Sequence, residues 1–278
     1  MEWNIVADSS CDLFELEEKQ EGITYASVPF TIQVEDKEYI DDEQMNTQDL
    51  VEASERSAKA SLTACPSSYA WYEKFEQQGN VIAVTISSEL SGSYNSACAA
   101  REMILEDDPD RKIAIIDSRS TGPEMILIIR KLCSLIRKGH DFETVIREIE
   151  NYRDHVQIIF ALSSFNNLIK NGRMNKLIGL IAGKLNFWGL GIASKEGRIQ
   201  IKQKLRGCKK VVSAIIEDMK EREILESSVI ICHCHNAKLA EELKAAIEAN
   251  FNAIEVKIFP TRGLCSFYAE NGGMLVSY

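Results

Sequence analysis

The stretch Ile86-Ser-Ser-Glu-Leu-Ser-Gly-Ser-Tyr-Asn-Ser-Ala97 is the most informative part of this 278-residue chain. The apolar run Val81-Ile-Ala-Val-Thr-Ile86 leads into it, and a helical pattern over 95–104 follows. A small-residue loop between a buried strand and a helix offers free backbone N–H groups, hydroxyls and the positive end of a helix dipole. We therefore predict that this loop binds a carboxylate or a phosphate.

The loop lacks the fingerprints of the common nucleotide sites. It contains no G-x-G-x-x-G and no G-x-x-x-x-G-K-[ST] with its phosphate-binding lysine. An anion site without these fingerprints indicates an acidic small molecule.

Strand and helix patterns alternate over most of the chain, which is typical of an α/β fold with a parallel sheet. Polar loops at Asp8, Thr63 and Asp117 follow further predicted strands, and in such a sheet they converge at one edge. After residue 155 the pattern becomes α+β, with a predicted hairpin around 195–197. We predict an N-terminal parallel-sheet α/β domain (1–155), a C-terminal α+β domain (156–278) and a ligand site between them.

The net charge and the hydropathy of the chain argue against nucleic-acid binding and against a membrane-spanning helix. The net charge of −10 disfavours nucleic acid as the main partner. A basic segment within 198–210 is the exception. A solvated strand–helix surface is the favoured explanation for it, and a docking patch or an anion-facing edge is the alternative. No apolar run reaches the length of about 18 residues needed for a membrane span. The start of the sequence has no signal-peptide pattern, so we expect a cytoplasmic protein with its eight cysteines reduced.

The motif Cys232-His-Cys-His235 resembles a set of metal ligands. It ends a predicted strand, in which alternation sends the two cysteines to one face and the two histidines to the other. One strand therefore cannot supply all four ligands of a tetrahedral zinc ion, and we predict no metal site.

Taken in order, several motifs resemble those of the DegV family, which is a bacterial family of fatty-acid-binding proteins. The resemblance spans essentially the whole chain. Its markers are Ile5-Val-Ala-Asp-Ser-Ser-Cys-Asp-Leu13, Val28-Pro-Phe30, Thr63-Ala-Cys-Pro-Ser67, the 86–97 loop, Ile116-Asp-Ser118, Asn171-Gly-Arg173, Leu185-Asn-Phe187, Gly197-Arg-Ile199 and Leu205-Arg-Gly-Cys-Lys-Lys210.

The resemblance implies a long-chain fatty acid held between two domains, with no cofactor and no catalysis by this chain alone. It also implies a partner kinase that phosphorylates the bound acid to an acyl phosphate. Thr63 and Ser91 match the residues that bind the carboxylate, and Arg173 and Arg206 match arginines near the headgroup. The implied ligand-binding set is Thr63, Ser91, Gly92, Ser93, Arg173 and Arg206.

The chain departs from the family pattern at its C-terminal motif. Ala269-Glu-Asn-Gly-Gly273 stands where the family often carries His-Thr-Gly-Pro-Gly, so the histidine linked to headgroup chemistry is missing. Ser91-Gly92-Ser93 replaces the usual Ser-Gly-Thr and keeps a hydroxyl.

Two apolar stretches are candidates for a lipid-tail pocket, but core packing alone is the favoured explanation for them. They comprise Ile158, Phe160 and Leu162 on one strand face, and Ile181, Leu185 and Phe187. Helix capping is likewise an alternative role for the loop hydroxyls.

Two other functions remain open. One is a small-molecule hydrolase or transferase that uses Asp8 and Asp117 at the strand ends. The other is a regulator that binds a protein through 198–210.

Overall fold

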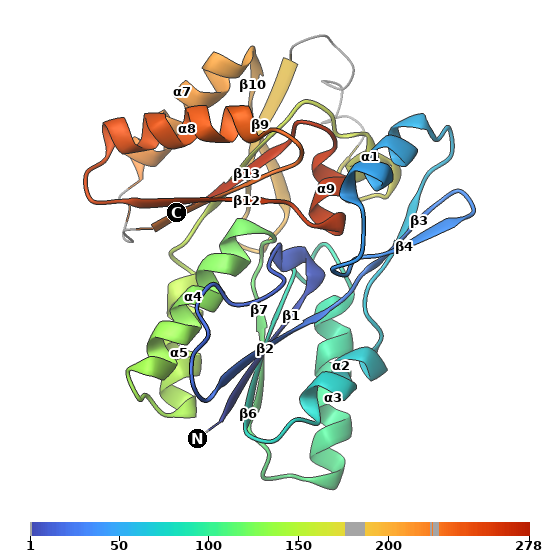
Figure 1. Cartoon of the computed structure of the whole chain (residues 1–278), viewed down its shortest axis with the longest axis vertical. Helices are drawn as coiled ribbons and strands as arrows, with labels where there is room; N and C mark the ends of the chain where they lie inside the picture. Colours follow the sequence, from blue (N-terminus) through green and yellow to red (C-terminus); the bar gives the residue numbers. More distant parts are fainter. Residues whose placement is uncertain (1, 176–186, 223, 225–227) are drawn as a thin grey trace.

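A computed structural model describes residues 2–175, 187–222, 224 and 228–278 (Figure 1). One half of the molecule is built on a parallel sheet with the strand order β2-β1-β6-β7. These strands are β1 (Trp3–Asp8), β2 (Ile23–Val28), β6 (Asn80–Thr85) and β7 (Ile113–Asp117). Every residue of β1 and β6 is buried, as expected for strands covered on both faces.

Helices cover both faces of this sheet (Figure 1). Val6 of β1 packs in one apolar cluster with Trp71 and Ala97, whereas its neighbour Ile5 packs in another with Met125. The alternation of strand side chains thus places one helix pair on each side. The first pair is α2 (Ser68–Phe75) and α3 (Ser93–Asp107), and the second is α4 (Pro123–Arg137) and α5 (Phe142–Arg153).

The other half of the molecule contains a six-stranded mixed sheet with the order β10-β9-β8-β13-β11-β12. Its strands are β8 (Ile158–Leu162), β9 (Phe187–Ala193), β10 (Ile199–Arg206), β11 (Ser228–His233), β12 (Glu255–Pro260) and β13 (Met274–Ser277). β9 and β10 pair antiparallel, which confirms the predicted hairpin. Helices α7 (Cys208–Glu221) and α8 (Ala237–Asn250) cover the outer face.

The inner face of the six-stranded sheet joins the core of the parallel-sheet half. Phe160 and Leu275 belong to the same apolar cluster as Met125 of α4. The predicted α/β fold class, with a parallel-sheet region and a separate sheet-rich region, is therefore confirmed. The division into 1–155 and 156–278 stays a prediction.

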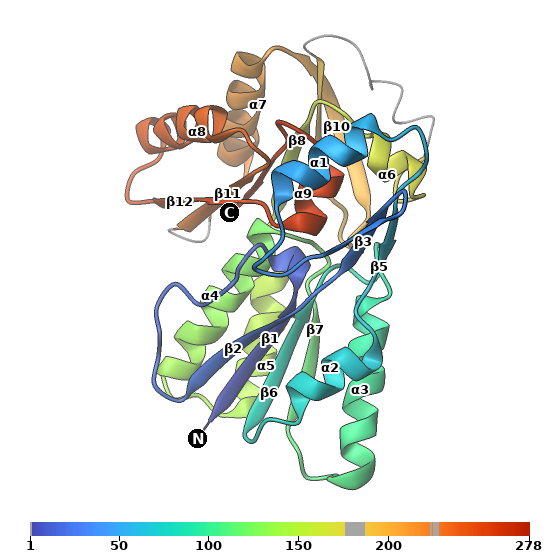
Figure 2. The same cartoon turned by 45° about the vertical axis from the view of Figure 1, so that its right-hand side comes forward.

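A third, antiparallel sheet has the order β4-β3-β5 and lies beside α1 (Thr47–Arg56) (Figure 2). It consists of β3 (Thr31–Val34), β4 (Lys37–Ile40) and β5 (Leu62–Ala64). The polar loop at Thr63 was expected to follow a strand of the parallel sheet, and this was wrong, because β5 pairs antiparallel with β3.

Three short helices complete the described elements. They are the 3-10 helix η1 (Ser9–Cys11) and the α-helices α6 (Asn166–Lys170) and α9 (Gly263–Ala269). An aspartate in this sequence position favours an N-cap of a helix starting near Leu13, but Asp12 instead ends η1 in a left-handed conformation. The sequence pattern over 176–185 predicts a helix, and this segment lies outside the described residues.

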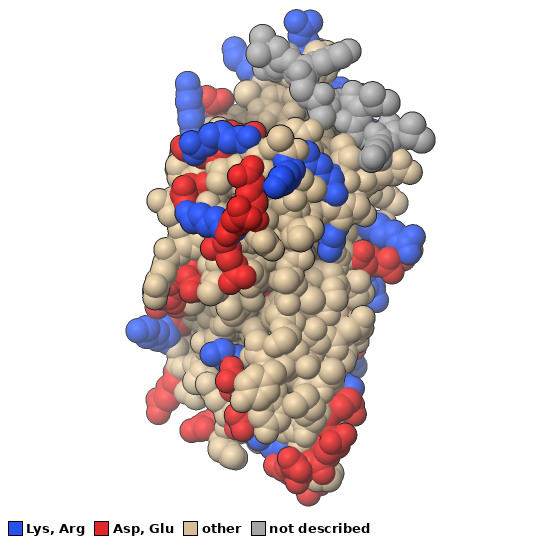
Figure 3. Space-filling view, turned by 90° about the vertical axis from the view of Figure 1, so that its right-hand side faces the viewer, with Lys and Arg blue, Asp and Glu red and all other residues tan. Residues whose placement is uncertain are grey.

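No helix in the described ranges is both long and apolar enough to cross a membrane. Figure 3 shows the face to the right of Figure 1, where acidic and basic side chains are interspersed and a broad area carries no charge.

Candidate functional site

A cavity lies between the parallel-sheet half and the inner face of the six-stranded sheet. It encloses about 860 Å³ of space free of atoms, counting its open mouth. Most of its wall is apolar, and the strand β8 supplies alternate side chains to it. Apolar lining residues include Ile158, Phe160 and Leu162 of β8, Ile192 of β9, Leu264 of α9 and Leu275 of β13.

Phe160 lies flat against β9 because its partner there is a glycine. Phe160 pairs with Gly191 across the sheet, and a Cβ on Gly191 would lie only 2.3 Å from the Cζ of Phe160. The ring occupies the space that a side chain would fill. Gly191 thus lets Phe160 form part of the cavity wall without projecting further into it.

A small set of polar side chains lines the same cavity. Thr63 comes from β5, Ser91 from the loop before α3, Arg173 from the turn after α6 and Tyr268 from α9. The cavity is also lined by Ser120, Thr121 and Arg198. The hydroxyls of Thr63 and Tyr268 lie 2.9 Å apart. The structure therefore brings together Thr63, Ser91 and Arg173, as the resemblance implies, and adds Tyr268.

The loop before α3 is folded by its own backbone. The N–H groups of Leu90 and Ser91 both donate to the carbonyl of Ser87, at 3.0 and 3.2 Å. The Oγ of Ser91 accepts a hydrogen bond from the N–H of Ser93 at 3.3 Å, in the first turn of α3. Ser91 therefore lies at the positive end of a helix and keeps its hydroxyl proton available for donation.

Arg173 brings a positive charge to the polar end of the cavity. Its guanidinium donates from Nε to the carbonyl of Leu90 at 3.2 Å and from Nη1 to the carbonyl of Asn171 at 2.6 Å. These two bonds hold its orientation. No carboxylate among the described residues forms an ion pair with it. An anion in the cavity would therefore meet an arginine whose charge no acidic side chain of the described ranges neutralises.

The remaining predicted ligand-binding residues lie elsewhere. Ser93 is fully buried, and its hydroxyl donates to Oδ2 of Asp8 at 2.7 Å. Gly92 borders an open groove beside the cavity mouth, which Ser91 and Arg173 also line. Arg206 is exposed on β10, with its guanidinium 5.8 Å from the ring centre of Phe187. The structure does not bring Ser93 or Arg206 together with Thr63.

Some of the residues predicted to form a lipid-tail pocket line the cavity, and others do not. Ile158, Phe160 and Leu162 line the cavity, whereas Phe187 begins β9 and does not. Ile181 and Leu185 lie outside the described residues.

Asp8 joins three segments of the parallel-sheet half. Besides Ser93, it accepts hydrogen bonds from the backbone N–H of Ile86 at 2.9 Å and from the hydroxyl of Ser10 at 2.5 Å. Burial raises its pKa, while these hydrogen bonds act in the opposite direction. Asp117 accepts from the N–H and hydroxyl of Ser88, at 3.1 and 2.6 Å. Neither carboxylate lines the cavity, so the geometry gives both a structural role.

Metal ligands do not cluster in the described part of the chain. No group of three or more His, Cys, Asp or Glu residues there could hold a metal ion. Cys232 and Cys234 are buried, whereas His233 is half-buried and His235 is exposed. The strand β11 ends at His233, so Cys234 and His235 lie beyond it, and His235 has a left-handed backbone with a φ of 51°.

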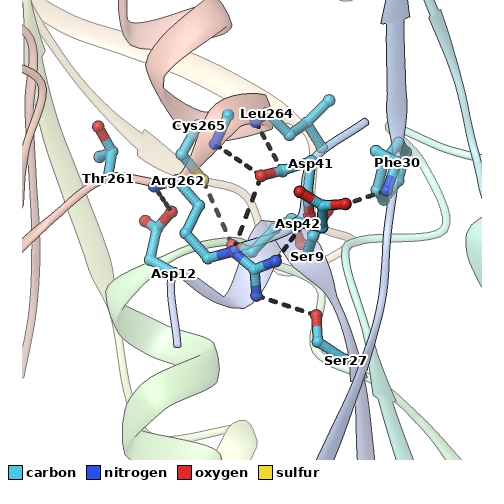
Figure 4. Close-up of polar contacts among 12 residues, drawn as sticks. Ser9, Asp12, Ser27, Phe30, Asp41, Asp42, Thr261, Arg262, Leu264 and Cys265 are labelled. Carbon is cyan, nitrogen blue, oxygen red and sulfur yellow. Dashed lines mark hydrogen bonds and ion pairs between the residues drawn. The ribbon is translucent and has the colours of Figure 1, made fainter. Parts of the chain in front are cut away.

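A buried ion pair fixes the helix that carries Tyr268 (Figure 4). Arg262, just before α9, is 2% exposed, and Asp41 is 0% exposed, with Nε and Oδ1 3.7 Å apart. The guanidinium also donates to the carbonyls of Leu13 and Asp41, each at 2.6 Å. The carboxylate of Asp41 accepts from the backbone N–H groups of Gly263 and Leu264, at 2.8 and 2.9 Å. The start of α9 is thus tied to η1 and to the end of β4.

Glu270 follows α9 but points away from the cavity. Its carboxylate accepts a hydrogen bond from the N–H of Asn167 at 3.0 Å, at the start of α6. Burial raises its pKa. Ala269, at the place of the family's histidine, is part of the cavity wall next to Tyr268.

Comparison with known proteins identifies the group to which the chain is similar. Residues 2–278 match a family model described as "Uncharacterised protein, DegV family". The DegV domain-containing protein spr0652 of Streptococcus pneumoniae is 41% identical over 278 residues, which cover 100% of this chain and 99% of that protein.

Solved structures of similar proteins carry fatty acids. The Fatty Acid Kinase (Fak) B3 protein of Streptococcus pneumoniae, loaded with linoleic acid, has a TM-score of 0.97 at 41% identity and covers 100% of this chain and 99% of its own. A DegV family protein of Eubacterium eligens, loaded with heptadecanoic acid, has a TM-score of 0.94 at 34% identity, covering 99% and 98%. The family model and the curated relative together confirm the resemblance, and this chain belongs to the DegV family.

Proposed function

We propose that this protein binds a long-chain fatty acid, with its carboxylate at the polar end of the cavity and its tail along the apolar wall. This proposal rests on one observation, which is that a single cavity has both polar and apolar side chains in its wall. Thr63, Ser91 and Arg173 line the same cavity as the apolar side chains of β8, and Arg173 donates to the carbonyl of Leu90, the residue before Ser91. A hydrocarbon chain with one ionised end matches both environments.

The two ends of such a ligand contribute differently. Burying a tail of about 15 methylenes, at about 0.8 kcal/mol each, contributes at most about 12 kcal/mol. Association and the ordering of the chain offset a good part of this free energy. Hydrogen bonds from Ser91 and Thr63 and the charge of Arg173 then fix which end of the molecule lies at the mouth. Affinity comes mainly from the tail, and orientation comes from the headgroup.

The bound acids of the similar proteins support this proposal. Linoleic and heptadecanoic acid occupy the proteins that are 41% and 34% identical to this chain. The two proteins have the overall fold of this chain along nearly its full length. Linoleic and heptadecanoic acid are both long-chain acids with one ionisable end.

We further propose that the protein presents its bound acid to a partner kinase, which supplies ATP and catalysis. The name of the Streptococcus pneumoniae protein supports this role. So does the position of the polar end, because Ser91, Arg173 and Arg198 line both the cavity and an open surface groove. A carboxylate held there would be reachable from outside while its tail stays buried. Arg198 is exposed and forms an ion pair with Glu89 at 2.8 Å.

A cytoplasmic location is part of the proposal. All eight cysteines are free thiols, and five of them are buried. This pattern is usual in a reducing compartment. Fractionation of producing cells, followed by immunodetection of the protein, tests the location.

Binding of linoleic acid to the delipidated protein tests the main proposal. We expect saturable binding to the wild type and binding about tenfold weaker for Ser91→Ala, because a hydrogen bond to a charged group is lost. Ser213→Ala is the matched control, since this exposed serine lies on α7 away from the cavity. Absence of saturable binding to the wild type would contradict the proposal.

A further inference from the structure

Tyr268 contributes a hydroxyl to the polar end of the cavity from a distant part of the chain. Its OH lies 2.9 Å from Oγ1 of Thr63, and the two residues are 205 positions apart. Both line the same cavity as Ser91 and Arg173. This contact is therefore built by the fold, and it belongs to the wall where a ligand headgroup would lie.

The two hydroxyls hold one proton more than their mutual hydrogen bond uses. Burial raises the pKa of Tyr268 above its ordinary value of 10.0, so its phenol stays protonated at neutral pH. The phenol is the more acidic hydroxyl and thus the better donor toward Thr63. When Tyr268 donates, the proton of Thr63 is left to donate to a third group. An anionic oxygen in the cavity is the acceptor that gains most from such a donor.

The phenol ring is held in place on several sides. Tyr268 lies on α9, whose start is fixed by the buried pair of Arg262 and Asp41 (Figure 4). Its ring packs edge-on against Phe267, with the ring centres 4.9 Å apart. Because the ring is already ordered, the hydroxyl can direct Thr63 at little further cost in conformational entropy.

We propose that Tyr268 is a positioning residue of the carboxylate subsite, where it orients the Thr63 hydroxyl so that the cavity selects ionised acids over neutral lipids with the same tail. The proposal rests on the fatty-acid binding proposed above. It assigns to Tyr268 a role in headgroup selectivity and none in holding the tail.

The test compares linoleic acid with linoleyl alcohol, which shares the tail but has no charge. For Tyr268→Phe we expect acid binding to be about ten- to a hundredfold weaker and alcohol binding to be unchanged, because a hydrogen-bond chain to a charged group is lost. The phenylalanine retains the ring, and a thermal melt checks that the variant is folded. Tyr69→Phe is the matched control, because Tyr69 is 62% exposed on α2.

A double-mutant cycle with Thr63 tests whether Tyr268 acts through it. In the Thr63→Val background, Tyr268→Phe should cause less than about a threefold further loss. Thr63→Ser keeps a hydroxyl and should keep most of the preference for the acid. Equal loss of acid and alcohol binding in Tyr268→Phe, no loss at all, or full additivity with Thr63→Val would each overturn the proposal.

The outcomes also separate this proposal from the proposed function. If the wild type binds neither ligand, the fatty-acid proposal itself fails. If the wild type binds linoleic acid and Tyr268→Phe binds it equally well, only the role of Tyr268 fails.

Discussion

Ser93 donates its hydroxyl proton to Oδ2 of Asp8 at 2.7 Å, and both side chains are completely buried. This bond ties the first turn of α3 to the end of β1. The anion-suited loop is thereby held at the cavity by a serine that does not itself line it. The hydroxyls of Ser91 and Ser93 are two positions apart in the loop 86–97 but have different roles. Ser91 lines the cavity, whereas Ser93 is buried behind the wall.

Ser93→Ala is expected to lower the free energy of unfolding by about 1–3 kcal/mol, because a buried carboxylate loses one of its donors. Urea denaturation followed by circular dichroism measures the change. Ser96→Ala on the same helix is the control and should change stability by less than about 0.5 kcal/mol. A Ser93→Ala protein of normal stability that no longer binds linoleic acid would assign this hydroxyl to the ligand instead.

The two arginines implied by the resemblance should behave differently. Arg173→Met is expected to weaken linoleic acid binding by about tenfold or more, because the charge that faces the carboxylate is lost. Arg206→Met should leave binding near the wild-type value, since Arg206 is exposed and off the cavity wall. Equilibrium dialysis with radiolabelled acid measures both. Equal losses in the two variants would show that the cavity wall does not define the headgroup site.

Gly191→Ala is expected to shift the acyl-chain preference toward shorter acids. The new Cβ would meet Cζ of Phe160 at 2.3 Å and the carbonyl oxygen of Gln200 at 2.5 Å, so the ring must move toward the cavity. Overpacking of this kind also lowers stability by about 1–3 kcal/mol.

Competition between myristic and linoleic acid measures that shift in preference. Phe160→Leu, which removes ring volume from the same wall, should shift the preference in the opposite direction. Unchanged competition in both variants would mean that the tail does not pass this wall.

Glu124 is expected to make the stability of the folded protein depend on pH. It is buried on α4, and burial raises its pKa from 4.5 to about 8, against the opposing effects of Ser120 and Arg153. The folded protein therefore keeps a proton that the unfolded chain releases, and stability should fall as pH rises from about 4.5 to about 8.

Glu124→Gln removes this proton uptake. As pH rises within that window, the unfolding free energy of the variant should therefore increase relative to that of the wild type, by up to about 1.4 kcal/mol per pH unit. Denaturation series at several pH values measure the difference in unfolding free energy. A difference that stays constant between about pH 5 and pH 8 would contradict a raised pKa.

Local sequence signals predicted the strand–loop–helix units well. The apolar run before Ile86 and the small polar residues after it act within about a dozen positions, so β6, the loop and α3 could be placed. The β9–β10 hairpin is a local feature of the same kind.

The parts that were missed depend on contacts between distant residues. Tyr268 meets Thr63 across 205 positions, and Arg262 reaches the carbonyl of Asp41 across 221. No sequence pattern predicts the contact between Tyr268 and Thr63, because the helix α9 is short and the strand β5 has only three residues. The resemblance places residues 63, 91 and 93 in one ligand-binding set, and only the packing of Ser93 removes its hydroxyl from the cavity.

Mass spectrometry of lipids released from freshly purified, denatured protein tests whether this chain carries a fatty acid. We predict a long-chain fatty acid in near-stoichiometric amount, and a strongly reduced amount from Arg173→Met purified in parallel. Arg206→Met provides the control and should release as much as the wild type. Release of no acyl lipid from the wild type, together with failure of the delipidated protein to take up linoleic acid, would contradict the account.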